Sequence, residues 1–184
     1  MKQREESEQE LLRKLRKKDQ LSWKTLYERH AGHLTFIAVR YVKSIDDARD
    51  VLQEAFIKMY HNIESFSFQG KGSLLAWMRR IVVNESLMHL RSQILMEELE
   101  DSKDHITEAK TEFTLGDISQ DEILSAIQSL PDGYRVIFNL YVFEEKSHKE
   151  IAELLGIKEN SSASQLHRAK KMLAEKITSL KNTK

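Results

Sequence analysis

Cysteine is absent from this chain of 184 residues, and proline and glycine are scarce, with one and six residues. Without cysteine, the chain has no disulfide, thiolate zinc site or cysteine nucleophile. So few turn-forming residues disfavour sheets with many tight turns, collagen-like repeats and flexible linkers. Apolar runs such as residues 81–83 are far shorter than a membrane-spanning helix, and the charged N-terminus lacks a secretory signal pattern. These absences predict a soluble, cytoplasmic protein.

The chain also lacks an excess of either charge, since 29 Lys and Arg residues balance 29 Asp and Glu residues. Their distribution along the chain is uneven. Residues 1–92 carry 17 basic and 12 acidic residues, residues 93–122 carry 2 and 10, and residues 123–184 carry 10 and 7. A neutral total therefore hides two mildly basic segments suited to binding a polyanion. The acidic segment between them should avoid phosphates.

Apolar residues recur at helical spacing along most of the chain. Such stripes predict helices over about 21–43, 46–62, 74–91, 120–129, 132–143 and 161–180, with a short one within the first 20 residues. Residues 93–120 lack sustained periodicity. We therefore predict an all-α fold of two small helical domains, 1–92 and 120–184, joined by an acidic linker, 93–119. The clearest stripe predicts a helix core of Ala48, Val51, Leu52, Ala55, Phe56, Met59 and Tyr60.

Residues 147–171 carry the strongest functional pattern. Ser147 and Glu150 form a capping-box pattern that opens a short helix, Gly156 ends it, and a second helix follows, which is typical of a helix-turn-helix. Small polar residues at the start of the second helix let it enter a DNA major groove, where Gln and Arg read bases and Lys reaches phosphates. The alternative is an ordinary helical hairpin with a solvated basic face. The candidate DNA-contacting residues are Ser161, Ser162, Ser164, Gln165, His167, Arg168, Lys170 and Lys171.

A second candidate nucleic-acid site is the loop 65–73 (SFSFQGKGS) with the helix that follows it. Aromatic rings and cations together are the means by which proteins stack on single strands and neutralise their backbone. Core packing is the alternative for the aromatic residues; it is favoured for Trp77 and left open for Phe66 and Phe68. The candidates are Phe66, Phe68, Lys71, Trp77, Arg79, Arg80 and Asn84.

Other chemical signals are weak. The polar face of residues 46–62 carries Asp47, Asp50, Gln53 and Glu54, which by themselves indicate a solvated helix face. His30 and His33 have a spacing that could hold a metal, but no third ligand is signalled nearby, so we predict no metal and no cofactor. P-loop, GxGxxG, GxSxG and HExxH motifs do not occur in the sequence. We therefore expect neither enzymatic activity nor a small-molecule substrate.

Two groups of motifs lie in the same order and spacing as in a known family. The run DARDVLQEAF at 47–56, GSLLAWMRRI at 72–81 and Asn84 form the first group. LPDGYR at 130–135, EIA at 150–152, Gly156 and SQLHRAK at 164–170 form the second. These residues resemble regions 2 and 4 of bacterial sigma factors of the extracytoplasmic-function (ECF) group, within the sigma-70 family. The second helix of the predicted helix-turn-helix departs from the commoner family pattern at residues 160–163.

This resemblance implies a non-enzymatic factor that binds core RNA polymerase and promoter DNA. It implies that Asp47, Asp50, Gln53 and Glu54 contact the polymerase. The loop 65–73 and the helix after it would take the −10 element as a single strand, and the helix at 161–171 would read the −35 element as a duplex. The family also implies an anti-sigma factor as a partner, often membrane-tethered.

Two rival functions remain at this stage. A stand-alone helix-turn-helix regulator would explain residues 130–180 but would leave the 46–92 motifs and the acidic linker without a role. An all-helical metal-dependent enzyme would have to be built around His30 and His33. A gel shift without polymerase separates the first rival from a sigma factor, and metal analysis tests the second.

Overall fold

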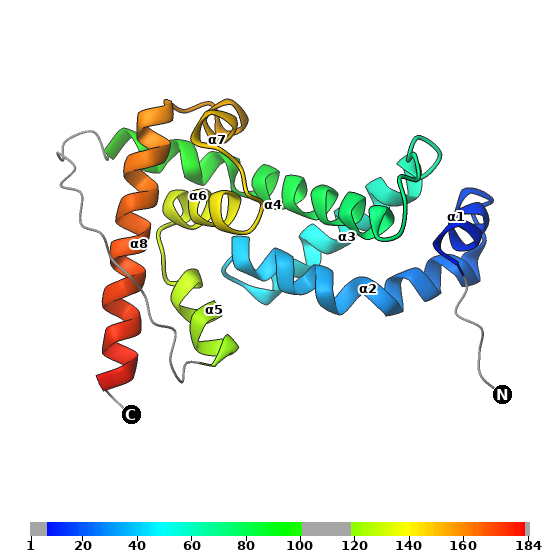
Figure 1. The fold of residues 1–184 in the computed structure, drawn as a ribbon, viewed down its shortest axis with the longest axis horizontal. Coiled ribbons are helices and arrows are strands. Elements are labelled where there is room, and N and C mark those ends of the chain that lie inside the picture. Colours follow the sequence, from blue (N-terminus) through cyan, green and yellow to red (C-terminus); the bar gives the residue numbers. More distant parts are fainter. Residues whose placement is uncertain (1–6, 101–118, 183–184) are drawn as a thin grey trace. The chain divides into compact units, whose positions relative to one another are not determined.

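A computed structural model describes residues 7–100 and 119–182 of the protein (Figure 1). Within these residues the chain forms helices and no strand, so the predicted all-α class is confirmed. It divides into two compact units, Met1–Met88 and His89–Lys184. The helices are α1 (Glu8–Arg16), α2 (Gln20–Tyr41), α3 (Ile45–Asn62), α4 (Ser73–Glu100), α5 (Gln120–Gln128), α6 (Asp132–Val142), α7 (His148–Leu155) and α8 (Glu159–Asn182).

Helix α4 is longer than the sequence pattern predicted. The prediction ended it near residue 91, whereas it continues to Glu100, into the segment assigned to the linker. That end point is wrong because residues 92–100 (SQILMEELE) are rich in Leu, Met, Glu and Gln, which favour helix even where the amphipathic stripe lapses. Residues 101–118, most of the predicted linker, lie outside the described part of the chain.

In the first unit, polar caps set the helix starts and an apolar core holds the helices together. The Asp19 carboxylate accepts the Ser22 N–H at the start of α2, and the Ser44 hydroxyl accepts the Asp47 N–H at the start of α3. Helix α2 packs against both α1 and α3. The buried residues of this core include Leu11, Leu15, Leu26, Leu34, Ile37, Val51, Ala55, Met59, Ile63, Met78 and Val82.

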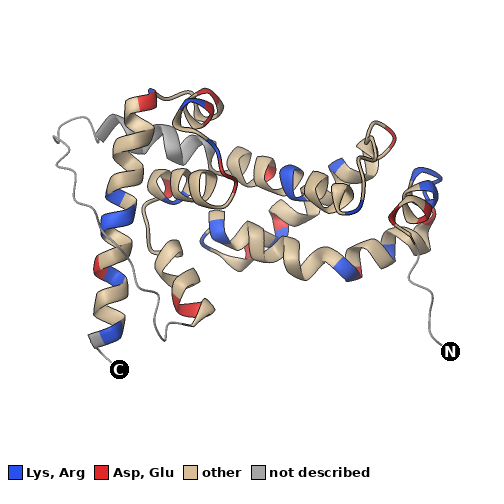
Figure 2. Ribbon diagram, in the orientation of Figure 1, with Lys and Arg blue, Asp and Glu red and all other residues tan. Residues whose placement is uncertain are grey.

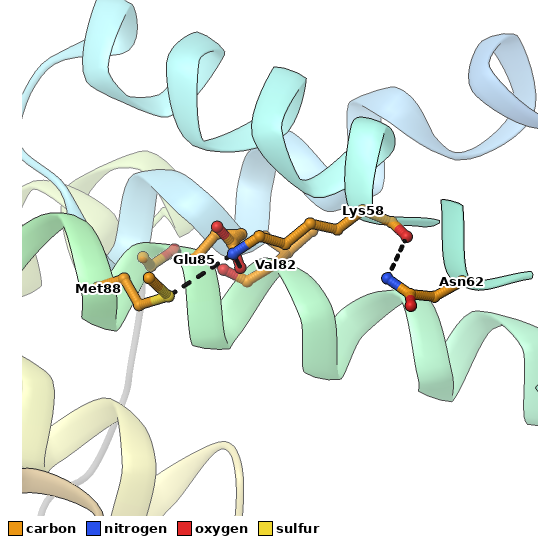
Figure 3. A network of polar contacts seen from close by, with 6 residues as sticks. Lys58, Asn62, Val82, Glu85 and Met88 are labelled. Atoms are coloured by element: carbon orange, nitrogen blue, oxygen red, sulfur yellow. Dashed lines mark hydrogen bonds and ion pairs between the residues drawn. The ribbon is translucent and has the colours of Figure 1, made fainter. Parts of the chain in front are cut away.

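A partly buried ion pair joins α3 to α4 within the first unit (Figure 3). The Lys58 ammonium lies 2.7 Å from a carboxylate oxygen of Glu85, which is almost fully buried. The same ammonium lies 3.6 Å from the Met88 sulfur, and the Asn62 amide donates to the Lys58 carbonyl oxygen. A carboxylate in this position needs a cation partner, so the pair helps to specify how α3 and α4 meet.

The second unit is organised around α8, which packs against α5, α6 and α7. Ser119 and Glu122 cap α5 reciprocally, and Ser147 and Glu150 do the same for α7. Pro131 precedes the first residue of α6, as predicted for a helix start. The core contains Ala126, Ile127, Leu130, Ala169 and Leu173, with Ile123, Tyr134 and Phe138 packed against it.

Candidate polymerase and nucleic-acid interfaces

The polar face of α3 is open to solvent. Asp50, Gln53 and Glu54 are exposed and Asp47 is partly exposed. Their positions follow from helical spacing, because Ala48, Val51 and Ala55 on the opposite side are buried in the core of the unit. We call these four residues the α3 polar face. It is accessible to a macromolecular partner.

Beside the α3 polar face lies an aromatic pocket of about 550 Å³ between α2 and α3. The Trp23 and Tyr60 rings are 5.1 Å apart, and the Tyr27 and Phe56 rings are 4.9 Å apart. Gln53 lines this pocket as well as belonging to the polar face. The sequence pattern missed the pocket, although the clustering of aromatic residues on α2 and α3 was a signal for it.

The prediction that Phe56 and Tyr60 belong to the α3 core is therefore corrected. Tyr60 is 39% exposed, and Phe56 is only partly buried. The apolar stripe of α3 is wider than the surface that α2 covers, so its edge lines the pocket. Tyr27, on the facing helix, is 49% exposed.

The two candidate phenylalanines of the loop 65–73 differ in burial. Phe66 is 6% exposed, and its ring packs against Trp77 with 5.2 Å between centroids, so Phe66 is a core residue. Burial leaves this ring no free face for a base, so the structure does not favour its predicted role in base stacking. Phe68 is partly exposed, and Gln69 and Lys71 are exposed. After Phe66, the accessible part of the loop is therefore residues 67–72.

The candidate residues of α4 fall on two faces. Trp77, Arg80 and Asn84 follow the spacing i, i+3, i+7 and share one face of the helix. Arg80 and Asn84 are exposed, and Trp77, predicted to be core, is half-buried against Phe66. Arg79 is about 200° round the helix from Trp77 and about 100° from Arg80, so it does not belong to that face. We call Trp77, Arg80 and Asn84 the α4 strand face.

Helices α7 and α8 form the predicted helix-turn-helix. Gly156 ends α7 with φ of 74°, a left-handed conformation that favours glycine, and its N–H donates to the Ala152 carbonyl. His148 Nδ1 lies 3.0 Å from the Ser162 hydroxyl and so connects the start of α7 to α8. Helix α8 starts at Glu159, two residues before the predicted start.

Helix α8 buries two of the residues predicted to contact DNA. Ser162 is fully buried and Gln165 is 7% exposed, and both lie on the face of α8 that carries the buried Leu166 and Ala169. Burial therefore disfavours direct base contact by Ser162 and Gln165. Arg168 is partly exposed and donates to the Tyr134 hydroxyl. Basic residues recur along α8 (Figure 2), and the accessible candidates are Ser161, Ser164, His167, Arg168, Lys170 and Lys171.

The capping box of α7 makes the stability of this motif sensitive to acid. Hydrogen bonds from the Ser147 hydroxyl and N–H lower the pKa of Glu150 from its ordinary value of 4.5. A lowered folded-state pKa stabilises the fold above the unfolded-state pKa, and this effect is lost as pH falls through the folded-state pKa. We expect Glu150→Gln to lower the melting temperature at pH 7 and to match the wild type well below pH 4.5. A melting-temperature difference that stayed constant across this range would contradict the assignment.

His30 and His33, the pair predicted not to bind metal, differ in burial, since His33 is exposed. His30 is half-buried, and burial together with the nearby Arg29 and His33 lowers its pKa. No group of three His, Asp or Glu side chains with metal-binding geometry occurs among residues 7–100 and 119–182. The same residues contain no helix long and apolar enough to cross a membrane.

Comparison with known proteins identifies both units. The family model for Sigma-70 region 2 matches residues 26–94, and that for Sigma-70, region 4 matches residues 120–173. The ECF RNA polymerase sigma-E factor of Haemophilus influenzae is 29% identical over 95% of this chain and 97% of its own length. SigW of Bacillus subtilis, an ECF RNA polymerase sigma factor, is 27% identical over 92% and 96%. The solved structure of CnrH in complex with the cytosolic domain of CnrY aligns with 92% of the chain at 20% identity and a TM-score of 0.49.

These matches define the class of protein: the chain belongs to the sigma-70 family of non-catalytic transcription initiation factors. Within that family it belongs to the ECF group, as its full-length relatives do. It binds core RNA polymerase and promoter DNA and directs promoter-specific initiation of transcription. A stand-alone regulator is not favoured, because it would account for the region 4 match alone.

Proposed function

We propose that this sigma factor binds core polymerase, the −10 element and the −35 element through three different surfaces. Core polymerase docks on the α3 polar face and the adjoining aromatic pocket. The exposed part of the loop 65–73 and the α4 strand face take the −10 element as a single strand, and α8 reads the −35 duplex. In this proposal residues 1–92 and 120–184 are the working domains and residues 93–119 are their linker.

One observation carries this proposal above all. The first unit leaves acidic Asp50 and Glu54 exposed next to the aromatic pocket. A factor that acted through its helix-turn-helix alone would have no need of this surface, whereas partner recognition commonly combines aromatic anchors with a polar rim. The test is run-off transcription with purified core polymerase on genomic promoter fragments. Specific transcripts that depend on this chain support the proposal. Tight binding of a DNA site without polymerase, and no transcripts, would favour the regulator.

We also propose that the chain acts in the cytoplasm without a catalytic site or a cofactor of its own. An anti-sigma factor, in many systems membrane-tethered, is the partner expected to occupy one or more of these surfaces and keep polymerase away. The resemblance to ECF factors supports this expectation. Competition between a candidate anti-sigma factor and core polymerase for the purified chain tests it.

The proposed strand-capture role of the loop predicts a selective defect in promoter melting. We expect a triple variant, Phe68→Ser, Gln69→Ser and Lys71→Ser, to form closed complexes normally and to lose permanganate-reactive thymines. Stacking on an aromatic ring is worth about 1–3 kcal/mol per base, so losing it should prevent strand capture. Phe66 is retained because its burial makes it structural. Glu64→Ser, at an exposed position just before the loop, is the control. Wild-type permanganate reactivity in the triple variant would exclude the loop as the capture site.

The proposed role of α8 predicts that substitutions at different positions of this helix change −35 binding in different ways. Arg168→Ala should cost about 1–3 kcal/mol at the −35 element and relax base preference, whereas Lys171→Ala should weaken binding to all sequences and reduce the salt slope by about 1. Gln165→Ala should leave base preference unchanged, because its side chain is buried. Lys176→Ala, an exposed change further along α8, is the control. Holoenzyme binding to matched and mutated −35 duplexes across salt concentrations measures all four. Unchanged base preference in Arg168→Ala would remove that residue from the reading surface.

A further inference from the structure

The N-terminal helix α1 holds the loop 65–73 at both ends. The two carboxylate oxygens of Glu8 accept the Gly72 N–H and the Leu74 N–H, at 2.6 and 2.7 Å. At the other end of the loop, the Arg16 guanidinium donates to the Phe66 carbonyl oxygen at 2.6 Å. Both contacts join residues at least 50 positions apart in the sequence. Both are charge-assisted, which makes them stronger than neutral hydrogen bonds.

Helix α1 is itself firmly held within the first unit. Leu11, Leu12 and Leu15 are all buried, and the Trp23 indole donates to the Leu15 carbonyl oxygen. These contacts keep Glu8 and Arg16 on a packed support. Helix α1 also lies outside residues 26–94, which match Sigma-70 region 2, so the family match assigns it no role.

The loop needs such support because its backbone is unusual. Gly70 and Gly72 have φ values of 113° and 88°, which residues with a side chain rarely adopt. Within the loop, the Ser73 hydroxyl accepts the Gln69 N–H and donates to the Gly70 carbonyl oxygen, which also accepts the Ser73 N–H. The contacts from α1 therefore restrict the ends while residues 67–71 stay accessible. A loop ordered before binding loses less conformational entropy when a strand arrives.

We propose that Glu8 and Arg16 are positioning residues that hold the loop 65–73 in the shape that accepts an unstacked base. Glu8 also satisfies two backbone donors at the start of α4, which would otherwise be free to bind water or a phosphate. An incoming strand thus meets a preformed loop whose amide donors at Gly72 and Leu74 are already occupied. This inference rests on the proposed role of the loop in strand capture.

The experiment compares Glu8→Ala, Glu8→Gln and Arg16→Met with Glu10→Ala, an exposed position in the same turn of α1. We expect Glu8→Ala and Arg16→Met holoenzymes to form closed complexes with wild-type affinity and to open promoters about tenfold less, which corresponds to about 1.4 kcal/mol. Glu8→Gln should open promoters to an extent between those of the wild type and Glu8→Ala, because one amide oxygen replaces two carboxylate oxygens. Glu10→Ala should match the wild type.

Amide NMR shifts of Gly72 and Leu74 in the free protein report on the contact without polymerase. They should move in both Glu8 variants and stay unchanged in Glu10→Ala. The loop triple variant described above tests the strand-capture role of the loop separately from its support by Glu8 and Arg16. Wild-type opening by the Glu8 and Arg16 variants, together with failure of the loop triple variant, would overturn the inference and leave the loop's function intact. Wild-type opening by the loop triple variant would overturn both.

Discussion

We expect the double variant Asp50→Arg with Glu54→Arg to lose co-purification with core RNA polymerase while its helices stay folded. Both side chains are exposed, so reversing their charge should change the free energy of unfolding by no more than about 0.5 kcal/mol. In the complex the same groups would be at an interface. Truncating one partner of a buried charge pair typically costs about 2–5 kcal/mol, mostly through faster dissociation. A pull-down with core polymerase and circular dichroism of one preparation measure both effects.

The matched control for this variant is Glu28→Arg with Glu64→Arg. It reverses the same number of charges in the same unit, at two exposed positions that do not belong to the α3 polar face. Glu28 pairs with Lys24 at 3.7 Å, and because both side chains are solvent-exposed this pair contributes little to stability. We expect the control to bind polymerase as the wild type does. If the folded Asp50, Glu54 variant also binds with wild-type affinity, the polymerase contact lies elsewhere on the first unit.

The second large effect is expected from Arg135, whose side chain is fully buried in the second unit. Its guanidinium donates to the Asp132 carboxylate at 2.6 Å and to the Leu130 carbonyl at 2.8 Å. Removing one partner of a buried ion pair typically costs about 3–5 kcal/mol, because the remaining charge keeps its desolvation cost. We expect Arg135→Met to lower the free energy of unfolding of the second unit by this amount. Chemical denaturation followed by helicity measures it.

Two further variants identify the cause of that loss. Lys176→Met removes an exposed cation of the same unit and should change the free energy of unfolding by no more than about 0.5 kcal/mol. Adding Asp132→Asn to Arg135→Met should restore part of the lost stability, because the carboxylate left without its guanidinium is then neutral. A loss for Arg135→Met no larger than that for Lys176→Met would show that the ion pair does not support this unit.

Local patterns determined the helical elements of this protein. Helical spacing predicted α3 and α6 to within a residue or two, because an apolar face and a polar cap act within one or two turns of the chain. The Ser147–Glu150 capping box and Gly156 likewise located the helix-turn-helix. The end of α4 was missed, since residues 92–100 favour helix without a continuous apolar stripe.

Only the tertiary structure decided which side chains remain accessible. Phe66 and Gln165 fit a binding site by residue type, yet contacts from other helices bury them, while Tyr60 stays exposed because α2 covers only part of α3. The Glu8 contact with Gly72 joins residues 64 positions apart, so no local pattern contains it. Burial and long-range hydrogen bonds depend on which surfaces meet after folding. Sequence spacing indicates the face of a helix on which a residue lies, and the neighbouring helices determine whether that face is covered.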